Sequence, residues 1–197
     1  VIIATDGVMA FAERLADRCQ AEANEADPGR AAELRRMAAN LRQAPAGPAE
    51  TFWQGLQAVW LLHMVFHSTL NGNALGRVDQ YLWPLLEGDL AAGRVDMAFA
   101  AELVDCFCLK FNERAKMTEE QSPEARQDEE LDSSQRTRHY TSSQIGRHRD
   151  RLDATNHWLQ NIVIGGLRPD GEDGTNPLSF LLLESYRRHE MTNPLLT

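Results

Sequence analysis

Apolar residues recur at helical spacing along most of the first 114 residues. A first helix is predicted from about 7 to 23, with an apolar stripe on one side: Val8, Phe11, Leu15 and Ala16. Asp27 followed by Pro28 is a helix start signal, because aspartate caps a helix and proline suits its first turn. It predicts a second helix over 28 to about 42, and further helices are predicted over about 52–70, 79–91 and 97–114.

The helix predicted over about 52–70 is apolar nearly all round. Such a helix is buried in the interior of a sizeable protein. The opening residues from Val1 and the closing TNPLLT also read as interior sequence. We therefore expect both ends of the chain to be truncations of a larger parent.

The residue composition changes twice along the second half of the chain. Residues from about 116 to 153 are polar and densely charged with mixed sign, which is typical of a solvated insertion. A β-branched run over 158–166 then predicts a buried strand, Asn176-Pro177 opens a last helix over about 178–189, and 194–197 start another strand. Helices followed by strand, helix and strand indicate an α/β barrel preceded by helical layers.

Composition narrows the class of protein. The apolar share is 43% and the charged share 25%, as in ordinary soluble globular proteins. A net charge of -9 argues against a nucleic-acid partner, whose binding needs clustered lysine and arginine. No apolar run reaches the roughly 18 residues of a membrane span. We expect a cytoplasmic protein with no membrane partner.

Cysteine and histidine give no metal site. Cys106 and Cys108 lie in a helical pattern where they point about 200° apart, so we expect them to be small buried thiols, and the odd count of three with Cys19 indicates reduced cysteines. His63 and His67 are four residues apart, but no third ligand and no HExxH motif accompany them. We expect buried or interface histidines and no bound metal.

The segment from 71 to 83, NGNALGRVDQYLW, carries the densest polar chemistry. We expect a tight connection here, and a polar cluster at the mouth of an apolar helix suits a small polar substrate. Asp79 is either a substrate-facing carboxylate tuned by Arg77 or the N-cap of the next helix with Arg77 as its ion pair. Asn73 is either a substrate ligand, with donor and acceptor, or a turn residue.

Five phrases in this order carry a family resemblance: TFWQGLQAVWLLH, GRVDQYLWPLLEGDLAAGRV, LVDCFCLKFNE, LQNIVIGGLRPDGEDGTNPLSFLLLES and TNPLLT. Together they resemble the N-terminal part of the pyruvate formate-lyase domain of glycyl radical enzymes. The resemblance implies a helix-rich α/β fold, a portion of a ten-stranded barrel with N-terminal helical layers. It makes 1–197 a partial domain with a charged insertion at about 116–153.

The resemblance also implies site residues. In similar dehydratases and choline lyases the aspartate matching Asp79 faces the substrate and can accept a proton, so Asp79 is the catalytic candidate. The substrate-binding candidates are amides and a cation around it: Asn73, Arg77, Gln80 and Asn161. Alternate residues of a barrel strand face the lumen, so either Gln160 or Asn161 points inward.

The implied activity is cleavage of a C–C, C–O or C–N bond of a small polar substrate by a thiyl radical, as in a lyase, dehydratase or formate acetyltransferase. No cofactor binds directly, since an iron–sulfur S-adenosylmethionine activase installs a radical on a backbone glycine. The radical-glycine motif and the Gly-Cys-x-Glu loop are absent from the 197 residues, so we expect both beyond Thr197 and this chain alone to be inactive. The expected partners are the substrate, the activase and a second copy of the parent.

Two alternatives stay open. In the first alternative, the chain is a catalytically inactive truncated module, and the exposed face of the apolar helix over about 52–70 binds a partner. Within the enzymes, the alternative is an arylacetate decarboxylase or a fumarate-adding enzyme, whose pocket would be more apolar.

Overall fold

A computed structural model describes residues 2–69, 73–111, 160–191 and 194–197. The predicted insertion at about 116–153 lies outside them. The described elements follow one another along the chain as α1 (Ile2–Glu22), α2 (Pro28–Gln43), α3 (Phe52–Thr69), β1 (Asn73–Arg77), α4 (Val78–Ala91), α5 (Met97–Lys110), β2 (Gln160–Val163), α8 (Pro177–His189) and β3 (Leu195–Leu196). This helix-rich fold with a small parallel sheet confirms the predicted class.

The helix start signals in the sequence are confirmed by hydrogen bonds. The Asp27 side chain accepts from the backbone N–H groups of Gly29 and Arg30 at the start of α2. The Asn176 side chain caps α8 in a reciprocal capping box with Ser179. Each contact satisfies a backbone donor that the first turn of a helix leaves unpaired, so these short motifs fixed their helix starts locally.

The tight connection predicted for the NGNALGR segment is wrong in its main feature. Residues 73–77 form strand β1, which pairs in parallel with β2 and contains a β-bulge between Ala74 and Gly76. The partner strand lies more than eighty residues later in the sequence, with Asn73 opposite Gln160. This five-residue strand contains one Asn, one Gly and no β-branched or aromatic residue, so it has no local strand signal and only the distant pairing reveals it.

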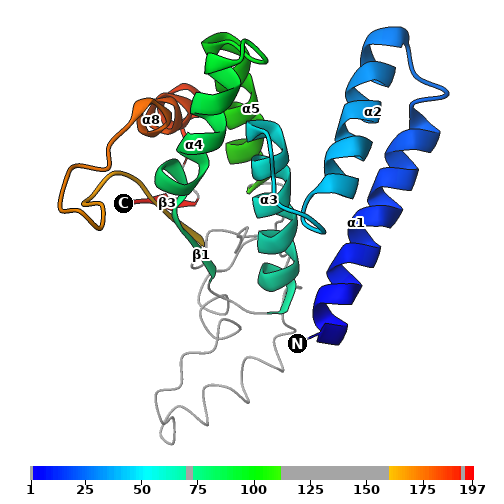
Figure 1. Cartoon of the computed structure of the whole chain (residues 1–197), viewed down its shortest axis with the longest axis horizontal. Helices are drawn as coiled ribbons and strands as arrows, with labels where there is room; N and C mark the ends of the chain where they lie inside the picture. Colours follow the sequence, from blue (N-terminus) through cyan, green and yellow to red (C-terminus); the bar gives the residue numbers. More distant parts are fainter. Residues whose placement is uncertain (1, 70–72, 112–159, 192–193) are drawn as a thin grey trace, which may run out of the picture.

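The helices form two groups (Figure 1). Helices α1 and α2 lie side by side on one side of the molecule and pack their small residues against α3, in a cluster of Ala12, Ala16, Ala38, Leu41 and Leu61. On the exposed side of this pair, Arg42 of α2 lies 2.9 Å from Glu13 and 2.7 Å from Asp17 of α1. Exposed ion pairs contribute little stability, so burial of the apolar stripe holds the pair together.

The main core lies between the sheet and helices α3, α4, α5 and α8. Its fully buried side chains include Phe52, Leu86, Phe111 and Ile162. The strand order is β1-β2-β3, all parallel. Burial alternates along β2, because Gln160 and Ile162 face these helices while Asn161 and Val163 face the other way. One face of the sheet is thus covered by helices, and we call the other the open face.

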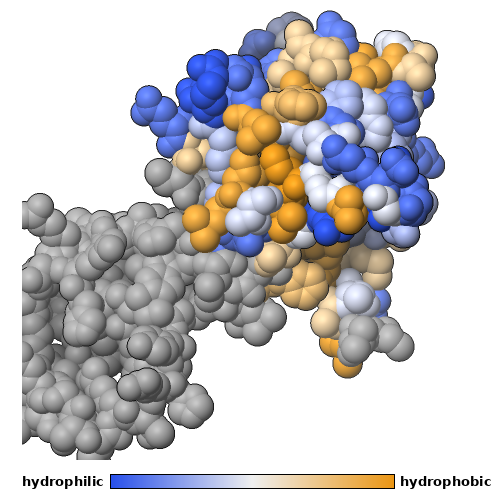
Figure 2. Space-filling model, turned by 90° about the vertical axis from the view of Figure 1, so that its left-hand side faces the viewer, coloured by the Kyte–Doolittle hydropathy of each residue, from blue (hydrophilic) through white to orange (hydrophobic). Residues whose placement is uncertain are grey.

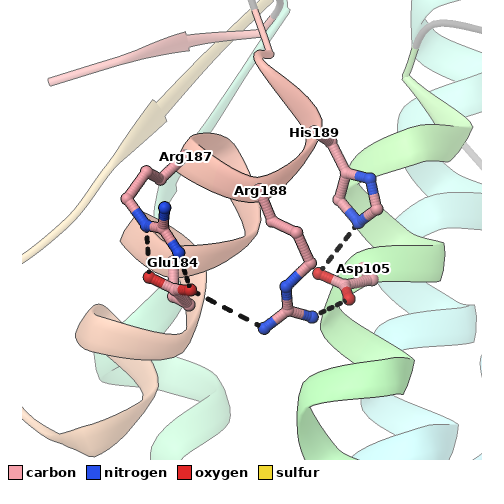
Figure 3. Close-up of polar contacts among 5 residues, drawn as sticks. All are labelled: Asp105, Glu184, Arg187, Arg188 and His189. Carbon is pink, nitrogen blue, oxygen red and sulfur yellow. Dashed lines mark hydrogen bonds and ion pairs between the residues drawn. The ribbon is translucent and has the colours of Figure 1, made fainter.

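A charged cluster joins the end of α8 to α5 (Figure 3). Asp105 of α5 pairs with Arg188, and its second oxygen lies 3.3 Å from Nε2 of His189. Arg187 pairs with Glu184 one turn earlier on α8, at 2.6 Å. Cations in the last turn of a helix interact favourably with the negative end of its dipole, and the contacts with Asp105 connect the end of α8 to α5.

Large apolar side chains remain exposed on several helices. Figure 2 shows an apolar band on the side of the molecule where α8 and its preceding loop lie. Leu167 of that loop is 64% exposed and Phe180 of α8 is 62% exposed, and Phe66 of α3 is 51% exposed. No helix in the described ranges is long and apolar enough to cross a membrane. The exposed face of α3 matches the surface that the partner-binding alternative requires.

The paired cysteines of α5 differ in their surroundings. Cys108 is completely buried and Cys106 is exposed, as expected for residues about 200° apart on a helix. Burial raises the pKa of the Cys108 thiol to about 12. Burial, together with nearby Glu102 and Asp105, also raises the pKa of Cys106. The prediction of small buried thiols is therefore confirmed for Cys108 and wrong for Cys106.

We expect iodoacetamide at pH 8 to modify Cys106 in the folded chain and to leave Cys108 unmodified. Reaction needs an exposed thiolate, and Cys108 offers neither exposure nor ionisation. Peptide mass spectrometry over a time course measures both sites. Because the Cys108 pKa is raised by folding, stability is expected to fall as the pH rises above the unfolded thiol value of about 8.5. Equal labelling rates at the two sites would contradict this packing.

Candidate functional site

The ends of β1 and β2 meet the start of α4 in a structure that we call the glycine junction. It consists of the first turn of α4 and the loop over 164–176 that follows β2. Gly165 and Gly166 adopt φ angles of 62° and 78°, a left-handed conformation that side chains other than glycine rarely take. Parallel strands place their carboxyl ends at one edge, which is where α/β proteins build ligand sites.

Asp79 lies at the centre of the glycine junction and is completely buried. Its Oδ2 accepts a hydrogen bond from the Gly165 N–H at 2.7 Å and another from the Ser179 hydroxyl. Its Oδ1 has no hydrogen-bond partner among the described residues. The Asp79 carbonyl oxygen accepts from Nδ2 of Asn176 at 3.2 Å. The first turn of α4 is thereby bonded to both ends of the loop.

The alternative reading of Asp79 as N-cap of the helix is wrong. The capping position belongs to Arg77, which makes no side-chain cap hydrogen bond. Arg77 also forms no ion pair with Asp79. Its Nη1 instead donates to the Leu167 carbonyl oxygen at 3.0 Å, and a Cβ added to Gly166 would lie 3.3 Å from its Nη2. Arg77 therefore lies against the glycine backbone.

Gln80 makes the third connection to the loop. Its Nε2 donates to the Gly165 carbonyl oxygen at 2.7 Å. Gly174 passes so close that an added Cβ would collide with the Gln80 side chain and lie 2.8 Å from the Gly166 carbonyl oxygen. The structure thus brings three of the predicted site residues together, with their polar groups on the loop backbone.

The two amides of β2 are separated by the strand. Oε1 of Gln160 lies 2.7 Å from Nε2 of His63, and both side chains are buried under the covered face. Asn161 lies on the open face, where its Oδ1 accepts from the Thr197 hydroxyl at 3.3 Å. Asn161 is therefore the amide that points away from the helices, and the prediction of a buried His63 is confirmed.

Asn73 is not brought to the glycine junction, since its Cα pairs with that of Gln160 at the opposite end of both strands. Arg77 is opposite Val163 at the other end of β1, on the same face as Asn161. The described residues contain no group of three or more His, Cys, Asp or Glu side chains placed to bind a metal ion. The open face carries amide, hydroxyl and guanidinium groups from Asn161, Thr197 and Arg77, beside the apolar side chains of Val163 and Leu195.

Three residues in or bonded to the glycine junction were not predicted as site residues from the sequence: Gly165, Asn176 and Ser179. Asn176 and Ser179 were visible only as a helix start, in the Asn-Pro-Leu-Ser pattern of a capping box. Nothing in the sequence connects them to Asp79, nearly a hundred residues earlier, so their second contact needed the fold.

The chain is similar to known proteins in both sequence and fold. The Pyruvate formate lyase-like family matches residues 1–197. Isethionate sulfite-lyase of Desulfovibrio desulfuricans is 31% identical over 98% of this chain, and (2S)-3-sulfopropanediol dehydratase of Klebsiella oxytoca is 26% identical over 98%. The structure of the 1,2-propanediol-dehydrating protein of Roseburia inulinivorans superposes with a TM-score of 0.78 and 27% identity over 99% of this chain.

These matches cover nearly all of this chain but only a small part of each similar protein. The chain covers 21% of each of the two curated relatives and 22% of the solved structure. Its small parallel sheet and helical layers thus correspond to about a fifth of a larger barrel. The chain belongs to the pyruvate formate lyase-like family of glycyl radical enzymes.

Proposed function

We propose that the chain is the N-terminal part of a glycyl radical lyase or dehydratase that cleaves a C–C, C–O or C–N bond of a small polar molecule. The observation that supports this most is the family match along the whole chain, from 1 to 197. The names of two relatives indicate the class of substrate, since isethionate and (2S)-3-sulfopropanediol are small molecules with hydroxyl and sulfonate groups. Hydroxyl and sulfonate groups need hydrogen-bond donors and cations at the site.

The open face of the sheet supplies such groups to the proposed substrate site. Asn161 projects there beside Thr197, and Arg77 ends β1 on the same face. We assign Asn161 and Arg77 to substrate contacts on the open face and Gln80 to support of the loop through its bond to Gly165, while the substrate-binding role of Asn73 stays a prediction. The predicted proton-accepting role of Asp79 stays a prediction, and it would use Oδ1, the oxygen without a partner among the described residues.

The radical chemistry of this proposal comes from outside the chain. A radical-SAM activase would install the glycyl radical in the remainder of the parent, which is proposed to act as a homodimer in the cytoplasm. The glycyl radical supplies the hydrogen-abstracting power through a cysteine thiyl. The residues described here would bind and orient the substrate and hold the barrel edge around it.

The test is anaerobic activation of the full-length parent with its activase and S-adenosylmethionine. We expect a glycyl radical signal by electron paramagnetic resonance and turnover of at least one substrate in a panel. The panel contains isethionate, (2S)-3-sulfopropanediol, 1,2-propanediol and an arylacetate, so it also reaches C–S cleavage and the decarboxylase alternative. Sulfite, aldehyde and carbon dioxide release distinguish the reactions.

Two results would contradict this proposal. One is a parent that forms no radical with an active activase, and the other is a parent that is fully active in air without any activase. Turnover of the arylacetate alone would replace the polar-substrate assignment by the decarboxylase.

The second candidate, an inactive module that binds a partner, is favoured by the exposed apolar side chains. Phe66 and Leu62 on α3 and Phe180 on α8 are 51%, 37% and 62% exposed. Leu62 and Phe66 lie four residues apart on one face of α3, and exposed apolar residues gathered on one face mark contact with another protein. Size-exclusion chromatography separates the candidates, because a monodisperse, cooperatively folding 197-residue chain supports the module and an aggregating chain supports the enzyme part.

A further inference from the structure

The burial of Asp79 limits what its carboxylate can contact. The side chain is 0% exposed, although the chain covers only about a fifth of the length of its relatives. Additional protein around an unchanged fold covers surface and cannot uncover it. A substrate therefore has no path to this carboxylate unless the glycine junction itself opens.

The bonds of the carboxylate lead to one backbone position. On the β1 side of β2, the strand pairing ends where Arg77 lies opposite Val163, because α4 begins at Val78. The Gly165 N–H, two residues after Val163, donates to Oδ2 of Asp79 at 2.7 Å. The Asp79 side chain thus provides the acceptor for this amide beyond the end of β1, and a buried N–H without an acceptor is costly.

The loop backbone at Gly165 and Gly166 needs contacts from other elements to keep one conformation. Gly165 and Gly166 have consecutive positive φ angles and carry no side chain to pack. Four further bonds converge on the same segment or anchor its far end: Gln80 to the Gly165 carbonyl oxygen, Arg77 to the Leu167 carbonyl oxygen, Gly174 N–H to the Gly166 carbonyl oxygen at 2.6 Å, and Ser179 to Asp79. All of them leave the loop in one conformation beside the open face.

We infer that Asp79 is a positioning residue: it fixes Gly165 and the carboxyl end of β2, and through them the orientation of Asn161 toward the substrate. Asn161 of β2 lies four residues before Gly165 of the loop, and one residue of slippage would move it to the covered face. This inference rests on the proposed function for the substrate, and it differs from the proton-accepting role in using Oδ2 instead of Oδ1.

The asparagine variant separates the two roles. In Asp79→Asn the amide oxygen can take the place of Oδ2 and accept from the Gly165 N–H and the Ser179 hydroxyl, while its NH₂ group takes the place of Oδ1. It keeps the hold on the loop and removes any proton acceptor. Asp79→Ala removes both, and Ser179→Ala removes one donor to the carboxylate.

In the activated full-length parent we expect Asp79→Asn to keep kcat within about tenfold of the wild type, since charged acceptors bind only about twice as strongly as neutral ones. Asp79→Ala is expected to lose roughly 100-fold or more, with a raised KM. Loss of a proton acceptor would instead cost the asparagine variant about 10²–10⁴-fold in kcat. That larger loss, with unchanged loop protection, would overturn the inference.

Hydrogen exchange gives a readout that does not depend on turnover. Peptides covering 164–176 are expected to exchange faster in Asp79→Ala, to be near wild type in Asp79→Asn, and to be intermediate in Ser179→Ala. Ser185→Ala is the matched control, because this serine is equally buried on α8 and makes no contact with Asp79. Unchanged exchange in Asp79→Ala would refute the positioning role, whereas a wild-type parent without a radical would refute only the proposed function.

Discussion

Replacement of Phe111 by alanine is expected to lower the free energy of unfolding by about 4 kcal/mol, in the range for large buried aromatics. The ring is completely buried and packs edge-on against Trp60, His63 and Phe107, with centroid distances of 5.1, 5.0 and 5.1 Å. Its removal leaves a cavity under the His63–Gln160 contact that supports β2. Urea unfolding followed by tryptophan fluorescence measures the change.

Phe180→Ala is the matched control for this substitution. Phe180 is 62% exposed on α8, so the same change in side chain is expected to alter stability by less than about 1 kcal/mol. Similar losses for the two variants would show that Phe111 is not in a closely packed core.

Replacement of Asp89 by alanine is expected to lower the free energy of unfolding by about 2–4 kcal/mol. Asp89 lies near the end of α4 and is 1% exposed, and it serves two elements at once. Its Oδ2 accepts from the backbone N–H of Phe52, the first residue of α3, at 2.8 Å, and its Oδ1 accepts from Nε of Arg94 at 2.6 Å. Alanine leaves a buried helix N–H without an acceptor, which costs more than an exposed one.

Asp96→Ala provides the comparison for Asp89. Asp96 caps its own helix α5 by accepting from the Phe99 N–H at 2.7 Å, in an exposed position where water can replace it. Its loss is expected to cost about 1 kcal/mol. Equal midpoints for both variants in the same unfolding assay would contradict the tertiary capping role of Asp89.

The helices were predictable because their signals are local. Asp27-Pro28 predicted one start to the residue and Asn176-Pro177 predicted another to within one residue, since each side chain caps donors within three positions of itself. The predicted strand at 158–166 was found as the shorter β2, and the strand at the chain's end was found as β3. β-Branched runs between Gly and Pro are clear signals even when their limits are not.

The candidate site was predictable in its residue types and not in its contacts. The sequence placed Arg77, Asp79 and Gln80 in one polar cluster, and the structure does bring them together. It could not show that all three bond to the loop after β2, because the partners Gly165 and Leu167 lie some ninety residues later. The pairing of β1 with β2 also decided that Gln160 faces the helices and Asn161 the open face.

The sequence by itself determined the helical layers, the family and the polar character of the segment that ends in α4. These follow from spacing, caps and composition, which act over a few residues. Only the tertiary structure decided that residues 73–77 are a strand, that Asp89 caps α3, and that the Asp79 carboxylate is enclosed. Strand partners and buried acceptors are chosen by groups far apart in the chain, because a backbone donor taken out of water must find whichever acceptor the packed fold brings to it.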